Sequence, residues 1–250
     1  MKIKRKYIIP ALLGILLVGC DKPKINEDKT SDFTVEVKNN SYLKLFQHVQ
    51  TEEAEETSHL SIDKVESITS AYSYKKLVNE YNGKIFEKIH DEKTDSDFGN
   101  STADNGYSFF KYTFYVKNTH SSSVSYNMFI ELKENIKPID SGIGMDEYLR
   151  LMVFEGDITP VIYARRSKSR YDETHETYKE YVCGPEGTEN YFGEAELFES
   201  DTILATYTNS LKAGEYRMYT LLFWLEAQDN ECNSLPDNTY IKATTTFEVF

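Results

Sequence analysis

The stretch YRMYTLLFWL, residues 216–225, decides the fold class of this chain. Its second half, LLFWL, is apolar at every position, so a strand built from it would be hydrophobic on both faces. Such a run suits a strand that is covered on both sides. We therefore expect a central strand here, with Trp224, the only tryptophan, as a marker of the core.

The segments around this run alternate between apolar and polar residues, as half-buried strands do. Residues 110–116 and 124–132 show the pattern, and the polar turn NTHSSS at 118–123 joins them, which predicts a hairpin with one buried face. Residues 241–249 alternate in the same way. Further strands are expected at 33–37, 149–154, 161–165 and 203–208, a short helix at 71–79, and a long polar loop at 91–106.

This spacing of short strands predicts a mostly β fold, an antiparallel, jelly-roll-like β-sandwich with minor helical content. The chain has 19 tyrosines and 14 phenylalanines, which favour strands and also offer rings for a sugar-binding face. We expect the sandwich to occupy residues 33–250, with 107–250 as its best-defined part.

The N-terminal sequence MKIKRKYIIPALLGILLVGC has a basic start and an apolar stretch at residues 7–18. That stretch is about half the ~20 residues needed to cross a hydrocarbon core. It ends in LVGC, residues 17–20, which resembles the bacterial lipobox. The resemblance implies a signal peptide at 1–19, a diacylglyceryl group on Cys20, and a polar tether at 20–32. An ordinary signal peptide that ends in cysteine is the alternative.

The chain after residue 19 is strongly acidic, with 24 basic residues against 41 acidic ones and a net charge of −17. Such a surface repels the phosphates of nucleic acids and of anionic lipids. We therefore expect no nucleic-acid partner. The lipid anchor on the extracytoplasmic face of a cell membrane is the expected membrane contact, and an envelope protein or a glycan is a possible partner.

Two cysteines remain after Cys20, and an even pair outside the cell predicts a disulfide between Cys183 and Cys232. Two free thiols are the alternative. No histidines pair at i, i+4, and no HExxH, GxSxG or P-loop motif is present, so we assign no catalytic residue, metal ligand or cofactor. The acidic clusters at 140–147 and 226–231 are candidate calcium sites, with plain loops as the alternative, and neither has EF-hand spacing.

The block FWLEAQDNEC, residues 223–232, together with KYTFYVKN at 111–118 and LKAGEYRMYTLLFWLE at 211–226, resembles the camelysin/TasA-type family of surface β-sandwich proteins from Gram-positive bacteria. The similarity covers residues 107–250. It implies a jelly-roll-like sandwich on the cell envelope. Some members of the family assemble into fibres, and others have been described as metallopeptidases. The lipobox departs from the family, whose members use ordinary secretion signals, and this puts fibre assembly in doubt.

The sequence therefore predicts a non-enzymatic, lipid-anchored envelope protein that acts as a surface binding or structural module. Two alternatives stay open, a camelysin-type secreted metallopeptidase and a solute-binding lipoprotein. The helix-poor pattern argues against the latter, because solute-binding proteins usually alternate strands and helices.

Overall fold

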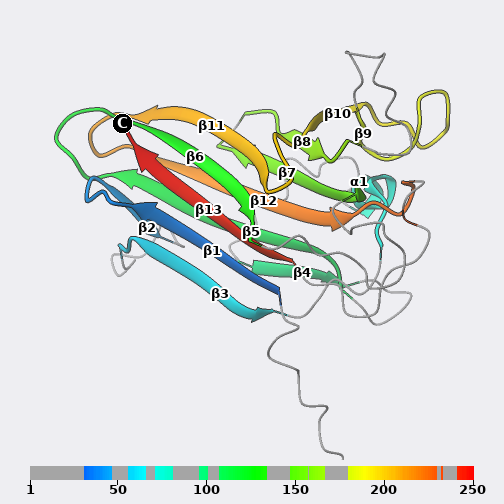
Figure 1. Ribbon diagram of the computed structural model, residues 1–250, viewed down its shortest axis with the longest axis horizontal. Coiled ribbons are helices and arrows are strands. Elements are labelled where there is room, and N and C mark those ends of the chain that lie inside the picture. Colours follow the sequence, from blue (N-terminus) through cyan, green and yellow to red (C-terminus); the bar gives the residue numbers. More distant parts are fainter. Residues whose placement is uncertain are drawn as a thin grey trace, which may run out of the picture.

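The computed structural model of the chain describes residues 31–46, 56–65, 71–80, 96–100, 107–133, 147–156, 158–166, 180–229, 232 and 241–250. These residues form two β-sheets packed face to face and one short helix (Figure 1), so the expected mostly β sandwich is confirmed. In chain order the elements are β1 (Ser31–Lys38), β2 (Leu43–Phe46), β3 (His59–Val65), α1 (Tyr74–Glu80), β4 (Ser96–Asn100), β5 (Tyr107–Asn118), β6 (Val124–Leu132), β7 (Leu149–Glu155), β8 (Val161–Ala164), β9 (Glu180–Tyr181), β10 (Glu194–Leu197), β11 (Ile203–Leu211), β12 (Tyr216–Leu225) and β13 (Lys242–Val249).

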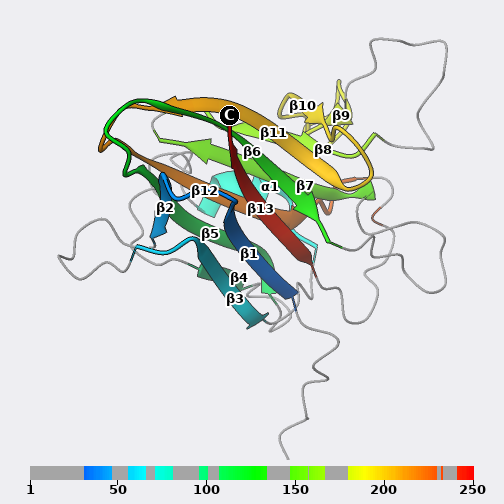
Figure 2. The ribbon, with the colours of Figure 1, turned by 60° about the vertical axis from the view of Figure 1, so that its left-hand side comes forward.

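The first sheet has five strands in the order β11-β6-β13-β1-β3. β6 pairs antiparallel with β11 and β13, but β1 and β13 run parallel, with Val35 opposite Thr245. In the other sheet β8 and β10 are also parallel. The expectation of a purely antiparallel sandwich is therefore wrong at these two pairs. The reason is topological: β1 and β13 start at the same end of the sandwich and lie side by side (Figure 2).

The second sheet has eight strands, and β12 lies inside it between β5 and β7. Its path runs β2-β5-β12-β7-β8-β10-β9, and β4 also pairs with β5. β2 and β4 follow each other along one edge of β5, at residues 115–118 and 107–112 respectively. β4 lies within residues 91–106, which we expected to be a loop. The polar composition of this segment does not reveal that part of it pairs with β5.

The main core lies between the two sheets and is built by the alternation seen in the sequence. β6 buries every second residue along its whole length, and β13 buries Ala243, Thr245 and Phe247 on the same side. From the other sheet, Leu221, Phe223 and Leu225 of β12 point into this core. At ~25 cal/mol per Å² of buried apolar surface, such a layer of aromatic and aliphatic side chains is the principal stabilising contribution.

Three connections whose residues are all described cross from one sheet to the other at the same end of the sandwich. They are residues 39–42 between β1 and β2, 119–123 between β5 and β6, and 212–215 between β11 and β12. We call this the arch end; the C-terminus lies there too (Figure 1). The hairpin predicted for β5 and β6 is therefore wrong. Both strands have the expected buried faces, but they belong to different sheets, and the turn between them is an arch.

A second core covers part of the outer face of the eight-stranded sheet. Leu222 and Trp224, which alternate with the main-core residues of β12, pack there against α1 and the segment 180–195. The two-sided burial predicted for residues 221–225 is thus confirmed. Each face has its own core, and Trp224 is fully buried.

The signal peptide and nearly all of the tether, including Cys20, lie outside the described residues. The first strand begins at Ser31, two residues before its expected start at residue 33. Among the described residues, no helix has the length and apolar character needed to span a membrane.

Candidate functional site

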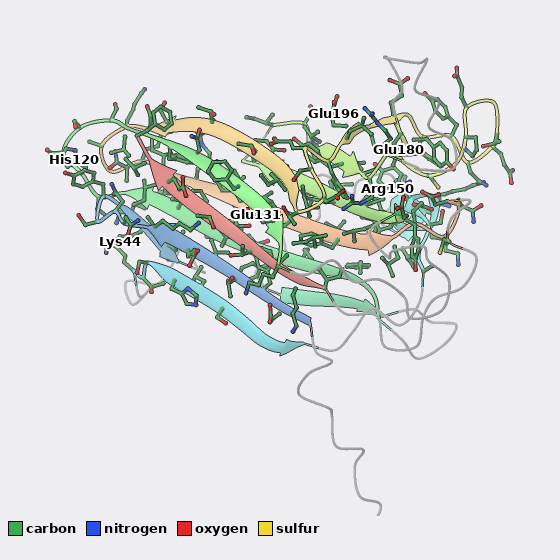
Figure 3. The ribbon with its side chains drawn as sticks, in the orientation of Figure 1. Lys44, His120, Glu131, Arg150, Glu180 and Glu196 are labelled. Carbon is green, nitrogen blue, oxygen red and sulfur yellow. The ribbon has the colours of Figure 1, made fainter. Side chains whose placement is uncertain are left out.

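The outer face of the eight-stranded sheet carries two groups of residues at opposite ends. The covered half is the second core with the buried polar residues beneath α1 and residues 180–195. The open half is the part of the same face that approaches the arch end. Figure 3 shows Arg150 and Glu180 on the covered side and Lys44 and His120 at the arch end.

Trp224 and Glu226 fix the helix onto the covered half. The indole of Trp224 stacks on the ring of Tyr74, with the centroids 5.8 Å apart. Its Nε1 donates to Oε2 of Glu226 at 3.0 Å, and the backbone N–H of Tyr74 donates to the same oxygen at 2.9 Å. A buried carboxylate is tolerated only where its oxygens are satisfied. Glu226 thus joins the end of β12 to the first residue of α1.

The start of α1 is capped by Ser73. Its Oγ accepts from the N–H of Lys75 at 3.2 Å, and its carbonyl accepts from the N–H groups of Lys76 and Leu77. Serine is a favoured N-cap because its hydroxyl satisfies a backbone donor that the helix leaves open. Ser73 therefore starts α1 and also places its hydroxyl against the thiol of Cys183.

Cys183 completes this cluster and is not bonded to Cys232. Both cysteines are free thiols, so the expected disulfide is absent from the structure. The thiol of Cys183 donates to Oε1 of Glu226 at 3.3 Å and lies 3.3 Å from Oγ of Ser73. These contacts direct the sulfur toward the helix cap and the Glu226 carboxylate. The backbone N–H of Cys232 donates to the carbonyl of Asp229 at 3.0 Å.

Both thiols are protonated at neutral pH. Burial and the Glu226 carboxylate raise the pKa of Cys183 from 9.0 to about 11. Burial, with Asp229 and Glu226, raises the pKa of Cys232 to about 11 as well. Because the thiolate is the reactive form, these environments make both sulfurs poor nucleophiles.

An ion pair that the sequence did not reveal lies in the same region. Nη2 of Arg150 meets Oδ2 of Asp229 at 2.6 Å, and both side chains are completely buried. The guanidinium also donates to the carbonyls of Val182 and Tyr181, each at 3.1 Å. Removing one partner of such a pair leaves a buried charge uncompensated, which typically costs about 3–5 kcal/mol. Arg150 thus holds residues 181–182 and 229 onto β7.

The acidic cluster at 226–231 is a candidate calcium site, but the carboxylates of Glu226 and Asp229 already bind groups of the protein. Glu226 receives backbone, indole and thiol donors, and Asp229 receives Arg150. In the part of the chain that the structure describes, no three His, Cys, Asp or Glu side chains are placed to hold a metal ion. Residues 140–146 and 230–231 lie outside that part.

The open half carries rings and lysines. Phe46 stacks on Tyr115 with centroids 5.2 Å apart and planes inclined by 13°, and Tyr216 meets both rings nearly edge-on. The register aligns Lys44 and Lys117 with Tyr216 across three strands. We call these five residues the aromatic platform. Phe46 is buried, whereas Tyr216 keeps 51% of its surface exposed.

The arches beyond the platform are tied together by Asn118. Its fully buried side chain donates from Nδ2 to the carbonyls of Ser122, Leu211 and Lys212 at 2.8, 3.0 and 3.1 Å. Its Oδ1 accepts from the N–H of His120 at 2.8 Å. One side chain thus fixes two arches. Asn118 is the first residue of the NTHSSS stretch. From the sequence alone it is interpreted only as a turn residue, and its bonds to two arches are not predictable.

The third arch is joined through Tyr42. The carbonyl of Tyr42 accepts from both the N–H and the Oγ1 of Thr119, at 2.7 and 2.9 Å. The ring of Tyr42 lies 4.2 Å from that of His120. Asn39 has a φ of 50°, a left-handed conformation that asparagine tolerates well, which lets this arch turn tightly. The arch end is therefore a bonded surface rather than three independent loops.

No protein-family model, curated protein or solved structure matches this chain. The assignment of function therefore depends on the residues themselves. Of the predicted site residues, Trp224 is confirmed in a core, Cys183 and Cys232 lie near Glu226 without bonding to each other, and Cys20 lies outside the described residues.

Proposed function

We propose that this chain is a lipid-anchored module on the extracytoplasmic face of a bacterial cell membrane. It presents its arch end to a partner and has no catalytic role of its own. The lipobox and the basic, apolar N-terminus support the anchor. Two acyl chains give a stable membrane attachment, whereas one chain alone binds only marginally.

The observation that carries the proposal is the direction of the first strand. β1 begins at Ser31 and ends at Lys38, next to the first arch. A chain anchored at Cys20 would therefore enter the sandwich at the end opposite the arches. The bonded arch end and the aromatic platform would then be the parts farthest from the point of attachment. This arrangement is suited to meeting a partner outside the membrane.

The buried polar cluster fits a structural role within this proposal. Its thiols are held protonated, and Glu226 and Arg150 are engaged by backbone groups and by Asp229. These contacts join α1, Val182 and Asp229 to the end of β12 and to β7. The cluster fixes the cover onto one half of the face, and the open half remains as the surface that a partner can meet.

Metabolic labelling with palmitate tests the anchor. The wild-type chain should be labelled and recovered with membranes, and Cys20→Ala should lose the label and accumulate as an uncleaved precursor. Cys232→Ala is the matched control, because it also removes one cysteine and should remain labelled. Undiminished labelling of Cys20→Ala would contradict the proposal.

The orientation is tested with Ser121→Cys, which places an exposed thiol in the arch of residues 119–123. The native thiols react slowly because their pKa values are raised to about 11. A membrane-impermeant maleimide added to intact cells should therefore label the variant far more strongly than the wild type. Labelling that appears only after lysis would show that the arch end does not face outward.

A further inference from the structure

We propose that the aromatic platform and Tyr42 form a binding surface for a neutral polysaccharide chain. This inference rests on the proposed surface role and names the class of ligand that the open half takes. It starts from the exposed rings. Tyr216 keeps 51% and Tyr42 keeps 42% of its surface exposed, although large aromatic side chains are generally buried.

The two tyrosines lie in neighbouring rows of the same face: Tyr216 ends the row of Lys44 and Lys117, and Tyr42 lies in the next row toward the arch end. The bond from Thr119 to Tyr42 continues the pairing of β2 with β5 by one residue, which places Tyr42 one row beyond Lys44 and Lys117. Tyr216 lies across from Lys117 in the next strand. The surface thus offers two ring positions with the side chains of Lys44 and Lys117 beside them. A sugar chain presents the matching pattern, apolar ring faces bordered by hydroxyls.

The backbone of β2 argues against an extended peptide as the occupant. Peptides that add to a sheet need an open strand edge. The N–H and carbonyl of Leu45 already bond to Thr57, at 2.7 and 2.9 Å, on the side of β2 that faces away from β5. Recognition on this face must therefore come from side chains, whose rings and donors suit a saccharide.

The charge of the platform argues against a polyanion. Nζ of Lys117 is engaged by Oε1 of Glu56 at 2.5 Å, which leaves Lys44 as the donor of the row among the described residues. The chain after residue 19 has a net charge of −17 and would repel a polyanion at long range. A single ammonium group beside two rings can donate hydrogen bonds to hydroxyls. It is not the cluster of cationic side chains that a polyanion would need.

The test is co-sedimentation of the full chain, in nonionic detergent, with insoluble chitin and with insoluble β-1,3-glucan. We expect the wild type to sediment with at least one of them, equally in 0.1 M and 1 M salt. Tyr216→Ala and Tyr42→Ala should each weaken half-maximal binding about tenfold, whereas Tyr216→Phe, which keeps the ring, should bind like the wild type.

Tyr191→Ala is the matched control, because Tyr191 is 37% exposed but lies in the segment 180–195. Its binding should equal that of the wild type. The proposal is overturned if neither polysaccharide retains the chain or if Tyr191→Ala loses as much binding as Tyr216→Ala. Retention that disappears in 1 M salt would indicate charge-driven binding and also overturn it. A change of oligomeric state in Tyr216→Ala would instead assign this face to contact between copies.

Failure of the polysaccharide proposal leaves the anchor proposal untouched. A chain that is palmitate-labelled at Cys20 but binds neither polysaccharide is still an envelope protein. A chain that binds but is not labelled keeps its saccharide surface and loses the proposed anchor. Trp224 emission of each variant reports whether the sandwich is intact.

Discussion

The two halves of the outer face of the eight-stranded sheet share strands β5 and β12 but differ in what lies against them. In the covered half, α1 and residues 180–195 exclude water from Trp224, and the buried side chains of Glu226 and Arg150 have defined partners. In the open half, Tyr216 stands half exposed in the same strand, eight residues earlier. The comparison shows that the two ends of one strand can have different roles. The end covered by other segments contributes to stability, and the uncovered end is available for recognition.

The largest effect should come from breaking the buried ion pair of the covered half. Asp229→Ala leaves the guanidinium of Arg150 buried without its carboxylate, and we expect the free energy of unfolding to fall by about 3–5 kcal/mol. Urea denaturation measures it. Glu248→Ala is the control, because Glu248 pairs with Lys38 at 3.6 Å in an exposed position, and its loss should cost less than about 1 kcal/mol. Equal losses in the two variants would show that Asp229 is not enclosed.

A smaller effect is expected at the helix cap. Ser73→Ala removes the hydroxyl that accepts from Lys75, and N-cap serines typically contribute about 1 kcal/mol. Thermal or urea unfolding should show this loss, together with weaker protection of the α1 amides in hydrogen exchange. Ser121→Ala, at an exposed position in an arch, should change stability by less than about 0.5 kcal/mol. An unchanged Ser73→Ala would mean that α1 does not depend on this cap.

The covered half should also lose stability in alkali. The pKa of Cys183 is raised from 9.0 to about 11 by burial and Glu226, so the folded state holds this proton after the unfolded state has released it. The resulting stability is complete below pH 9 and is lost as the pH rises toward 11, by about 1 kcal/mol at pH 10. Cys183→Ser does not titrate there and should show a correspondingly flatter pH profile. Identical slopes for the two proteins would contradict the burial of this thiol.

The smallest effect is expected in the open half. Tyr216→Ala removes a ring that is half exposed, and we expect a loss of about 0.5 kcal/mol. The same denaturation series measures it. A loss as large as that of Asp229→Ala would show that the platform is part of a core, and the distinction between the two halves would fail.

Residue patterns predicted the strands well, because a strand with one buried face has an apolar residue at every second position. The alternation in β6 and β13 and the apolar run of β12 each matched the observed faces. Sheet membership was not predictable in this way. A period of two is the same for a hairpin and for an arch, so the pattern of β5 and β6 could not reveal that they lie in different sheets.

The candidate site was harder to predict because its contacts join distant segments. Arg150 and Asp229 are separated by 79 positions, and Ser73 and Cys183 by 110. A lone arginine in the otherwise apolar stretch LRLMVF was a usable signal for a buried pair. The disulfide was inferred from the number of cysteines, but that number carries no information about the direction of each sulfur. Glu226 and Ser73 determine that direction for Cys183.

The fluorescence of Trp224 tests the central claim most directly, because it is the only tryptophan and lies under the cover of the second core. The account predicts a blue-shifted emission that acrylamide quenches poorly in the native protein and freely after unfolding in urea. The open half should not affect it, so Tyr216→Ala should leave both the emission maximum and the quenching constant unchanged. A red-shifted emission that acrylamide quenches freely in the native protein would place Trp224 at the surface and contradict the account.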